Sequence, residues 1–537
     1  MSLPEGVCGY MKKISVLDCT LRDGGYVNDF KFGKANIKAI IGELAKASID
    51  IIECGFLRSG SKDSDRTIFP SVSEIREYIG EKNDNSMYVA MIQYGTFDTN
   101  DLEINNGKSI DGIRLTFHEH EIAGSLRFAE HLMDKGYKVF IQPVGTTSYD
   151  DDVLIALIKD INRLRPYAFY MVDTLGKMYK NDLLHLFYLV DHNLDDRIAL
   201  GFHSHNNLQM SFANAQELTQ INSKRNLIID ASVLGMGRGA GNLNTELLVQ
   251  YLNVNQGLKY DVFKIMNIMD QYIKPLSAIY KWGYDAVYYL AAVTECHPNY
   301  ASFLLNTQTL QVKDIGTILN GLSTEKKTLF DKEYIQSEYM KYMDHSVDDS
   351  DTREKLMRII DGKKVLLLAP GKSLRNNTNR ILELVDSLKC IVVSINFIPT
   401  DIPVDMAFVS NMKRFKNTKE MMADEKVKIV LTSNIATSCE GCMIVNYASY
   451  LNEDINIIDN AGMMCINLLT QIGIKHIILA GFDGFTGDIK EDFYEESLYV
   501  DVEQERLAKM NIAMSNKIKL LKKQINIEFF ASSIYDK

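Results

Sequence analysis

The chain has 537 residues, 46% of them hydrophobic, which is too long for one compact core and predicts at least two domains. Its 59 Lys and Arg against 70 Asp and Glu give a net charge of −11, which disfavours nucleic acid and anionic membranes and favours a small-molecule substrate. Without a signal-peptide pattern or an apolar run that could span a bilayer, we expect a cytoplasmic protein with no membrane span.

Up to about residue 275, short apolar runs alternate with stretches of helical periodicity, the pattern of repeated βα units. Eight such units in roughly 260 residues match the size of a closed (β/α)8 TIM barrel, which we expect over residues 1–275. The expected strands are Ile14–Leu17, Ile49–Glu53, Met87–Ile92, Gly112–Leu115, Lys138–Gln142, Ala168–Val172, Ile198–Phe202 and Ile228–Ser232.

Beyond the barrel, residues 276–343 contain no strand pattern and are expected to form a helical appendage. The acidic run Asp344–Asp351 indicates a linker over residues 344–361. The βα rhythm then resumes, which predicts a separate Rossmann-like, doubly wound α/β domain over residues 362–537. Its expected strands are Lys364–Ala369, Ile391–Ser394, Met406–Val409, Ile429–Thr432, Ile455–Ile458 and His476–Ala480.

Polar side chains follow several of the expected barrel strands, at the end where catalytic groups of such barrels lie. His203 and His205 share one face of a strand, and Asp23 follows the first strand, so the three can hold one divalent cation. Mixed imidazole and carboxylate ligands suit Mn²⁺, Mg²⁺, Zn²⁺ or Fe²⁺, and the residues do not select among these metals. We expect Mn²⁺ or Mg²⁺, with Zn²⁺ or Fe²⁺ as alternatives. Arg22 offers a planar fork that could grip a substrate carboxylate or stabilise an enolate oxygen, and the glycine-rich run Gly235–Asn242 could let Asn242 reach the site.

Five segments carry a resemblance to a known family: Leu17–Gly25, Ile52–Phe56, Val172–Gly176, Gly201–Asn207 and Gly235–Asn242. Together they resemble the DRE-TIM metallolyases, also called the HMG-CoA lyase-like family, which includes aldolases, HMG-CoA lyase, Claisen-type synthases and pyruvate carboxyltransferases. The resemblance is greatest to 4-hydroxy-2-oxovalerate aldolase and extends from about Ile14 to Leu322.

The resemblance implies roles for individual residues. Asp23, His203 and His205 would ligate the metal, with Asn242 as a fourth ligand. Arg22 would stabilise the enolate, and Thr174 would sit at the substrate carboxylate. Arg22, Glu53 and Thr174 together are the expected substrate-binding residues. Tyr300 would lie near the chemistry.

Two departures from the family pattern affect the expected reaction. The Gly235–Asn242 run lacks the cysteine of HMG-CoA lyase, which disfavours that activity. Gly25 and Tyr26 stand where the aldolase has His and the synthases have Glu-Gln, so the general base is open between Tyr26 and His118, the latter also readable as a surface histidine.

The expected function is therefore a metal-dependent, aldolase-type carbon–carbon lyase that acts on a 2-oxo acid such as pyruvate and an aldehyde through a metal-bound enolate. A Claisen-type acyl-CoA synthase is the alternative enzyme. A degenerate barrel that serves as a binding module in surface-glycan biosynthesis is the alternative outside enzymes. A homodimer is expected by analogy with the family.

In the C-terminal domain the expected strands end in small polar residues, which is typical of a ligand-binding crevice in an open parallel sheet. Segments near Ala369, Val393 and Ala480 resemble the Rossmann-like domains of sialyltransferases and motility accessory factors. We therefore expect a nucleotide or sugar nucleotide as its ligand.

Overall fold

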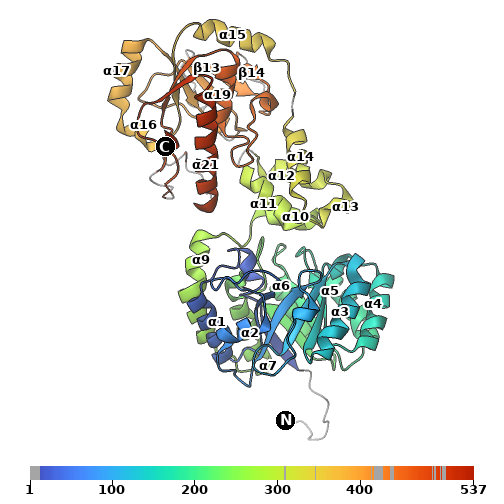
Figure 1. Cartoon of the computed structure of the whole chain (residues 1–537). Coiled ribbons are helices and arrows are strands. Elements are labelled where there is room, and N and C mark those ends of the chain that lie inside the picture. The colour runs from blue at the N-terminus through green and yellow to red at the C-terminus, as the bar shows by residue number, and fades with distance from the viewer. Residues whose placement is uncertain are drawn as a thin grey trace, which may run out of the picture. The chain divides into compact units, whose positions relative to one another are not determined.

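The computed structural model describes residues 13–307, 310–344, 346–412, 414–415, 427–435, 441–486, 488, 492–495, 498 and 504–536 (Figure 1). The chain divides into two compact units. The first comprises Met1–Ser302 and Ser323–Phe330, and the second comprises Phe303–Leu322 and Asp331–Lys537.

The first unit is built on a closed barrel of eight parallel strands, as predicted. The strands follow the order β1, β9, β8, β7, β6, β5, β4, β2, and pairing of β1 with β2 closes the ring. The short β3 pairs with β2 outside the ring. Strand bounds are β1 Ile14–Asp18, β2 Ile51–Leu57, β3 Ile68–Phe69, β4 Met87–Gln93, β5 Gly112–Phe117, β6 Lys138–Pro143, β7 Ala168–Asp173, β8 Ala199–Ser204 and β9 Leu227–Ala231.

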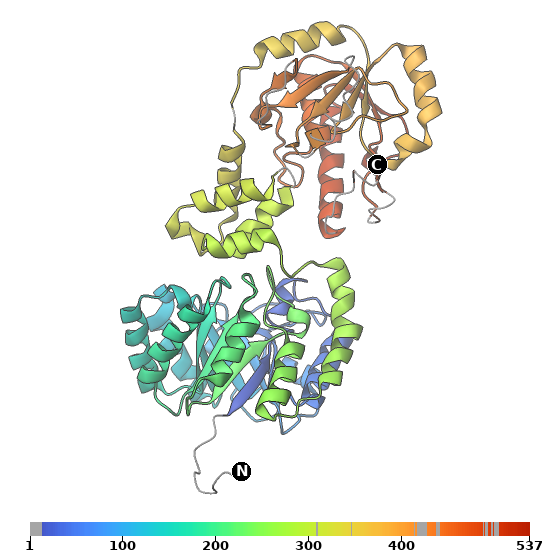
Figure 2. The same ribbon diagram turned by 180° about the vertical axis from the view of Figure 1, so that it is seen from behind.

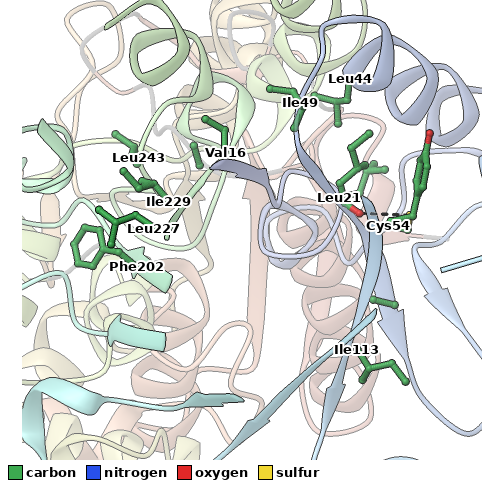
Figure 3. Close-up of a cluster of buried hydrophobic side chains, with 14 of the residues drawn as sticks. Val16, Leu21, Leu44, Ile49, Cys54, Ile113, Phe202, Leu227, Ile229 and Leu243 are labelled. Carbon is green, nitrogen blue, oxygen red and sulfur yellow. Dashed lines mark hydrogen bonds between the residues drawn. The ribbon is translucent and has the colours of Figure 1, made fainter. Parts of the chain in front are cut away.

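Each barrel strand is buried on both faces, because alternate side chains face the barrel interior and the surrounding helices. On β1, Leu17 packs inside the barrel with Ile51 and Ile228. Its neighbour Val16 belongs to the outer layer between strands and helices, with Ile229 and Phe202 (Figure 3). The near-continuous apolar runs of the sequence thus reflect two cores, one on each side of the strands.

Helices surround the barrel in both views (Figures 1 and 2). Local signals mark several starts: Ser71 accepts a hydrogen bond from the Glu74 backbone nitrogen at the start of α2, and Asp261 caps α8. The helices around and just after the barrel are α1 Lys34–Lys46, α2 Val72–Ile79, α3 Ile122–Asp134, α4 Asp151–Leu164, α5 Lys180–Asn193, α6 Ser211–Gln220, α7 Thr245–Gln256, α8 Val262–Ile268 and α9 Lys274–Ile279.

The segment after the barrel is helical. Its helices are α10 Ala286–Val293, α11 Pro298–Thr307, α12 Val312–Gly321, α13 Thr324–Lys327 and α14 Lys332–Met343. A further helix, α15 Ser350–Ile360, occupies most of the stretch for which the sequence suggested a linker. No helix in the described part of the chain is long and apolar enough to cross a membrane.

The second unit contains a parallel sheet of seven strands in the order β14, β13, β12, β11, β10, β15, β16. The chain runs outward from β10 to β14 and then returns to the other side of β10, so the order reverses between β10 and β15. Strand bounds are β10 Val365–Leu368, β11 Ile391–Ile395, β12 Met406–Val409, β13 Lys428–Thr432, β14 Met443–Val445, β15 His476–Ala480 and β16 Asn526–Phe529; the helices are α16 Lys372–Asn376, α17 Thr378–Leu388, α19 Ala461–Gln471 and α21 Gln504–Leu521.

Five of the six strands predicted for this unit are present, and Ile455–Ile458 is wrong. That segment forms turns in which the Ile457 nitrogen donates to the Asp454 carbonyl. Its isoleucines resemble a strand in sequence because Ile457 and Ile458 are buried without being paired in the sheet. The sheet instead contains β14 and β16, which the sequence pattern did not reveal.

Candidate active site

Asp23, His203 and His205 converge at the carboxyl end of the barrel. Asp23 lies in the turn after β1, His203 lies near the end of β8, and His205 follows that strand. One ligand atom of each residue lies within 4.8 Å of the other two, and all three side chains are buried. The two imidazoles can face the same point because positions i and i+2 of a strand share a face.

The ring of His203 is oriented by a carboxylate. Its Nδ1 lies 2.9 Å from Asp230 Oδ2, a residue of β9, so the ring donates its Nδ1 hydrogen to Asp230. The Nε2 lone pair then faces Asp23, at 4.0 Å from Oδ1. A carboxylate that holds the far nitrogen of a metal-binding histidine fixes both its tautomer and its direction.

His205 is held in its neutral form. Burial lowers the pKa of His205 to about 3, and the positive charge of Arg238 acts in the same direction, against the attraction of Asp23. Its imidazole therefore carries a free lone pair at neutral pH, as a metal ligand must.

Asp23 is ionised. Burial alone would raise the pKa of Asp23, but the positive charge of the neighbouring Arg22 holds it well below its usual range. Its Oδ1 accepts from Arg22 Nη1, and its Oδ2 accepts from Asn242 Nδ2 at 2.8 Å. The Asn242 amide also donates to the Met236 carbonyl at 3.0 Å, which leaves the Asn242 oxygen buried without a partner among the described residues.

A chain of buried ion pairs connects the two sides of the metal-ligand set. Arg22 Nε donates to Glu53 Oε2 at 2.8 Å, and Arg114 Nη1 donates to the same oxygen at 2.6 Å. Arg114 Nη2 donates in turn to Asp230, the residue that orients His203. The opposite charges of Glu53 and Asp230 raise the pKa of Arg114 despite its burial.

These residues fit a divalent cation. The 4.0 Å between His203 Nε2 and Asp23 Oδ1 is too long for a hydrogen bond but lies within the span of two ligands that are each about 2.1 Å from one ion. One anionic oxygen and two neutral imidazoles, with the far nitrogen of His203 supported by Asp230, form an established type of donor set for Mn²⁺, Fe²⁺ or Zn²⁺. The donor set does not select among these metals.

The remaining predicted residues fall into two groups. Glu53 is in the ion-pair chain, and Thr174 follows β7 with its hydroxyl oxygen 2.9 Å from the Gly145 backbone nitrogen. Tyr26 is partly buried beneath the guanidinium of Arg238, and His118 stacks on His120. The hydroxyl of Tyr300, by contrast, lies 2.8 Å from the carbonyls of both Lys326 and Leu329, so it ties α11 to the α13 segment.

Four residues of the site were not predicted from the sequence: Arg114, Asp230, Arg238 and His297. The first two are charged residues inside apolar strands, and their isolation in those runs is a signal that they face a polar interior. Arg238 and His297 lie close enough to influence each other and His205 electrostatically. Burial lowers the pKa of His297 to about 3, and its Nδ1 accepts from the Asn299 nitrogen, which leaves the proton on Nε2.

Residues 110–271, which include His203, His205 and Asp230, match the HMGL-like family model. The chain therefore contains an HMGL-like domain at these residues. The chain is 29% identical over 245 residues to oxaloacetate decarboxylase of Mycobacterium tuberculosis, a match that covers 44% of this chain and 69% of the relative. It is 26% identical over 275 residues to 4-hydroxy-2-oxovalerate aldolase of Pseudoalteromonas translucida, covering 49% of this chain and 77% of the relative. The resemblance to the HMG-CoA lyase-like family that the motifs suggested is thereby confirmed.

Among solved structures, the HMGL-like domain is similar to the HMG-CoA lyase of Brucella melitensis, with a TM-score of 0.39 and 15% identity over 49% of this chain and 99% of that one.

In the second unit, the polar strand ends come together near the point where the strand order reverses. The Ser373 nitrogen lies 2.7 Å from Asp483 Oδ2, which joins the loops after β10 and β15. After β11, Asn396 accepts from the Ser410 nitrogen at 3.0 Å, and Ser394 at the end of that strand is buried with no partner for its hydroxyl among the described residues.

Proposed function

We propose that the barrel cleaves or forms a carbon–carbon bond adjacent to the carbonyl of a 2-oxo acid, as an aldolase that produces or consumes pyruvate. The class of enzyme, a metal-dependent carbon–carbon lyase, follows from the similarity to curated aldolases and a decarboxylase. The observation that supports the proposal most directly is the set of Asp23, His203 and His205, buried together with Asp230 behind one histidine.

When bound, Mn²⁺ or Mg²⁺ would be held by these three side chains and would supply Lewis-acid polarisation of the substrate carbonyl. The free oxygen of Asn242 is available as a further ligand.

The residues around the ligands are suited to bind the rest of the 2-oxo acid. Arg22 uses Nε and Nη1 in ion pairs, and its Nη2 is buried with no partner among the described residues. This donor can stabilise the oxygen on which negative charge develops, because a fixed cationic donor in a buried site needs no reorganisation. Among the described residues, the Thr174 hydroxyl only accepts a hydrogen bond, from the Gly145 nitrogen, so its hydrogen can be donated to the substrate carboxylate.

The proton-transfer group stays open between Tyr26 and His118, and the structure adds His297 as a donor. With its Nδ1 occupied by the Asn299 nitrogen, the neutral His297 ring can donate a hydrogen bond from Nε2 to the oxygen of the half that leaves or joins, while Tyr26 or His118 takes up or returns the proton.

Decarboxylation of oxaloacetate is a second candidate reaction, favoured by the 29% identity to the decarboxylase. It requires the same stabilisation of charge beside the carbonyl as an aldol cleavage, so the same residues serve both reactions. Release of pyruvate from oxaloacetate, compared with release from a 4-hydroxy-2-oxo acid, distinguishes the two.

The test is exchange of the pyruvate methyl hydrogens into D₂O, followed by mass spectrometry in the presence of Mn²⁺ or Mg²⁺. We expect exchange that stops on chelation of the metal and in His203→Ala. The matched control is His192→Ala, which changes an exposed histidine of α5 and should exchange like the wild type. Exchange that persists without metal or in His203→Ala would overturn the proposal, and thiol release from acetyl-CoA would replace it with a Claisen-type synthase.

For the second unit, a nucleotide or sugar nucleotide at the reversal between β10 and β15 is the ligand that best fits an open parallel sheet. The inward polar groups after β10, β11 and β15 support this, and a role in surface-glycan assembly would follow. Dimer formation, the cytoplasmic location and the proposed domain limits at residues 276, 344 and 362 stay predictions.

A further inference from the structure

Arg238 is a charged side chain at the mouth of the barrel that the ion-pair chain does not use. It lies in the glycine-rich loop after β9, and its guanidinium carbon is 4.1 Å from the centre of the Tyr26 ring. Among the described residues, this guanidinium forms no hydrogen bond and no ion pair. All five of its N–H donors are therefore available to a ligand.

The loop holds Arg238 in a fixed place. A Cβ on Gly237 would lie 2.6 Å from Asn242 Nδ2, and one on Gly239 would lie 3.0 Å from Asn207 Oδ1 at a backbone φ of +64°. Neither position accepts a side chain without displacement of a neighbour. Met236 and Ala240 are buried, so Arg238 is the side chain of this loop that reaches solvent.

Tyr26 forms a rigid platform below the guanidinium. Its ring makes edge contacts with Phe30 and Phe56, at centroid distances of 5.1 and 5.9 Å. Stacking on a fixed aromatic ring restricts the guanidinium before a ligand arrives, and less conformational entropy is then lost on binding.

The other arginines of the site cannot offer the same recognition. Arg114 is fully buried between Glu53 and Asp230, and Arg22 has one free donor group left. Of these three arginines, Arg238 alone can therefore hold a second negative group of the substrate in a bidentate manner.

We propose that Arg238, stacked on Tyr26, binds a second anionic group of the substrate, a carboxylate or a phosphate on the half that joins or leaves the 2-oxo acid. The inference rests on the proposed function for the identity of the first half. It makes Arg238 the residue that selects acidic over neutral partners at this site.

The kinetic test compares matched partners in the condensation with pyruvate. Succinic semialdehyde is paired with butanal, and glyceraldehyde 3-phosphate is paired with glyceraldehyde. The wild type should prefer one acidic partner over its neutral match in kcat/KM, and Arg238→Gln should reduce this preference by about 10–100-fold, mainly through KM. Arg238→Lys should restore part of it as a point charge, and the pair with the larger loss tells carboxylate from phosphate.

A binding test separates this proposal from the proposed function. Succinate, glycerol 3-phosphate and glycerol are titrated into the Mn²⁺-loaded protein by calorimetry, which requires no turnover. One of the two anions should bind the wild type at least about tenfold more tightly than Arg238→Gln, and glycerol should not distinguish them. If pyruvate exchange fails while this difference remains, the proposed reaction is wrong and the anion site stands. Equal affinity of both proteins for both anions would overturn the anion site.

Discussion

Replacement of Asp230 tests whether the buried ion-pair chain supports the metal ligands or only the fold. Asp230 is 1% exposed and accepts hydrogen bonds from His203 Nδ1 and from Arg114 through the same oxygen, Oδ2. Asp230→Ala removes both and leaves the Arg114 charge buried with Glu53 as its remaining partner. Asp230→Asn can keep an oxygen at the Oδ2 position and removes only the charge.

Two magnitudes follow from these contacts. Loss of one partner of a buried ion pair costs about 3–5 kcal/mol, so Asp230→Ala should lower the free energy of unfolding of the barrel by that amount. Loss of the carboxylate behind a metal-binding histidine lowers metal affinity by about 10–100-fold, which corresponds to roughly 1.4–2.8 kcal/mol. Asp230→Asn should show a smaller loss in both quantities.

The unfolding of the barrel can be measured separately from that of the second unit. The single tryptophan of the chain, Trp282, lies in the first unit, where its indole donates to the Leu234 carbonyl at 3.1 Å. Urea unfolding followed by its fluorescence therefore reports the barrel, and calorimetric titration with Mn²⁺ gives the affinity. Asp270→Asn, which breaks an exposed ion pair with Lys274, should change neither. Unchanged Mn²⁺ affinity in Asp230→Ala would refute the argument that Asp230 orients His203.

Two further predictions use the same fluorescence assay. Tyr300→Phe should lose about 1 kcal/mol of stability and keep its turnover rate within about threefold of the wild type, because its hydroxyl lies on the carbonyls of Lys326 and Leu329; a fall in turnover by about two orders of magnitude would instead place this tyrosine in the chemistry. His297→Gln should make the barrel less sensitive to acid. The pKa of His297 is about 3 in the folded protein against an ordinary 6.5, so between pH 6.5 and pH 3 the histidine takes up a proton only when the protein unfolds. From pH 7 to pH 4 the free energy of unfolding of the wild type should therefore fall by roughly 1–3 kcal/mol more than that of the variant. Urea unfolding at several pH values checks the second result, and an equal pH dependence would contradict it; Asp18 and Asp173, whose burial raises their pKa to about 6, act in the opposite direction in both proteins.

The barrel could be predicted from the sequence because its strands are buried on both faces and appear as uninterrupted apolar runs. The same property located the ends of the strands, and so placed Asp23 and the two histidines at one rim. The second sheet was predicted less completely. Its edge strand β16 has an exposed Asn526 and an exposed Glu528, so it lacks the apolar run by which a central strand is recognised. The buried turn at Ile457 does have an apolar run, which is why it was mistaken for a strand.

The ion-pair chain could not be predicted, because it depends on which strands become neighbours across the closed ring. Glu53 and Arg114 are 61 residues apart, and Arg114 and Asp230 are 116 apart. No feature of the sequence around Glu53, Arg114 or Asp230 indicates its ion-pair partner. The sequence shows a charge inside an apolar run, and only the barrel shows that the charges pair within it.

Tyr26 has a structural role in the site in addition to its candidacy as the proton-transfer group. From the sequence, Gly25 and Tyr26 in place of the aldolase histidine left the general base open. In the structure, Tyr26 supports Arg238 at 4.1 Å, while the ligand set beside it retains its orienting carboxylate and its ionised Asp23. Burial of the ionised Asp23 and the neutral His205 costs desolvation free energy. A bound cation would offset this cost, and a barrel that no longer binds a metal would carry the cost without compensation. The stacking of Arg238 on Tyr26 is thus consistent with the proposed selection of an acidic substrate half at this position.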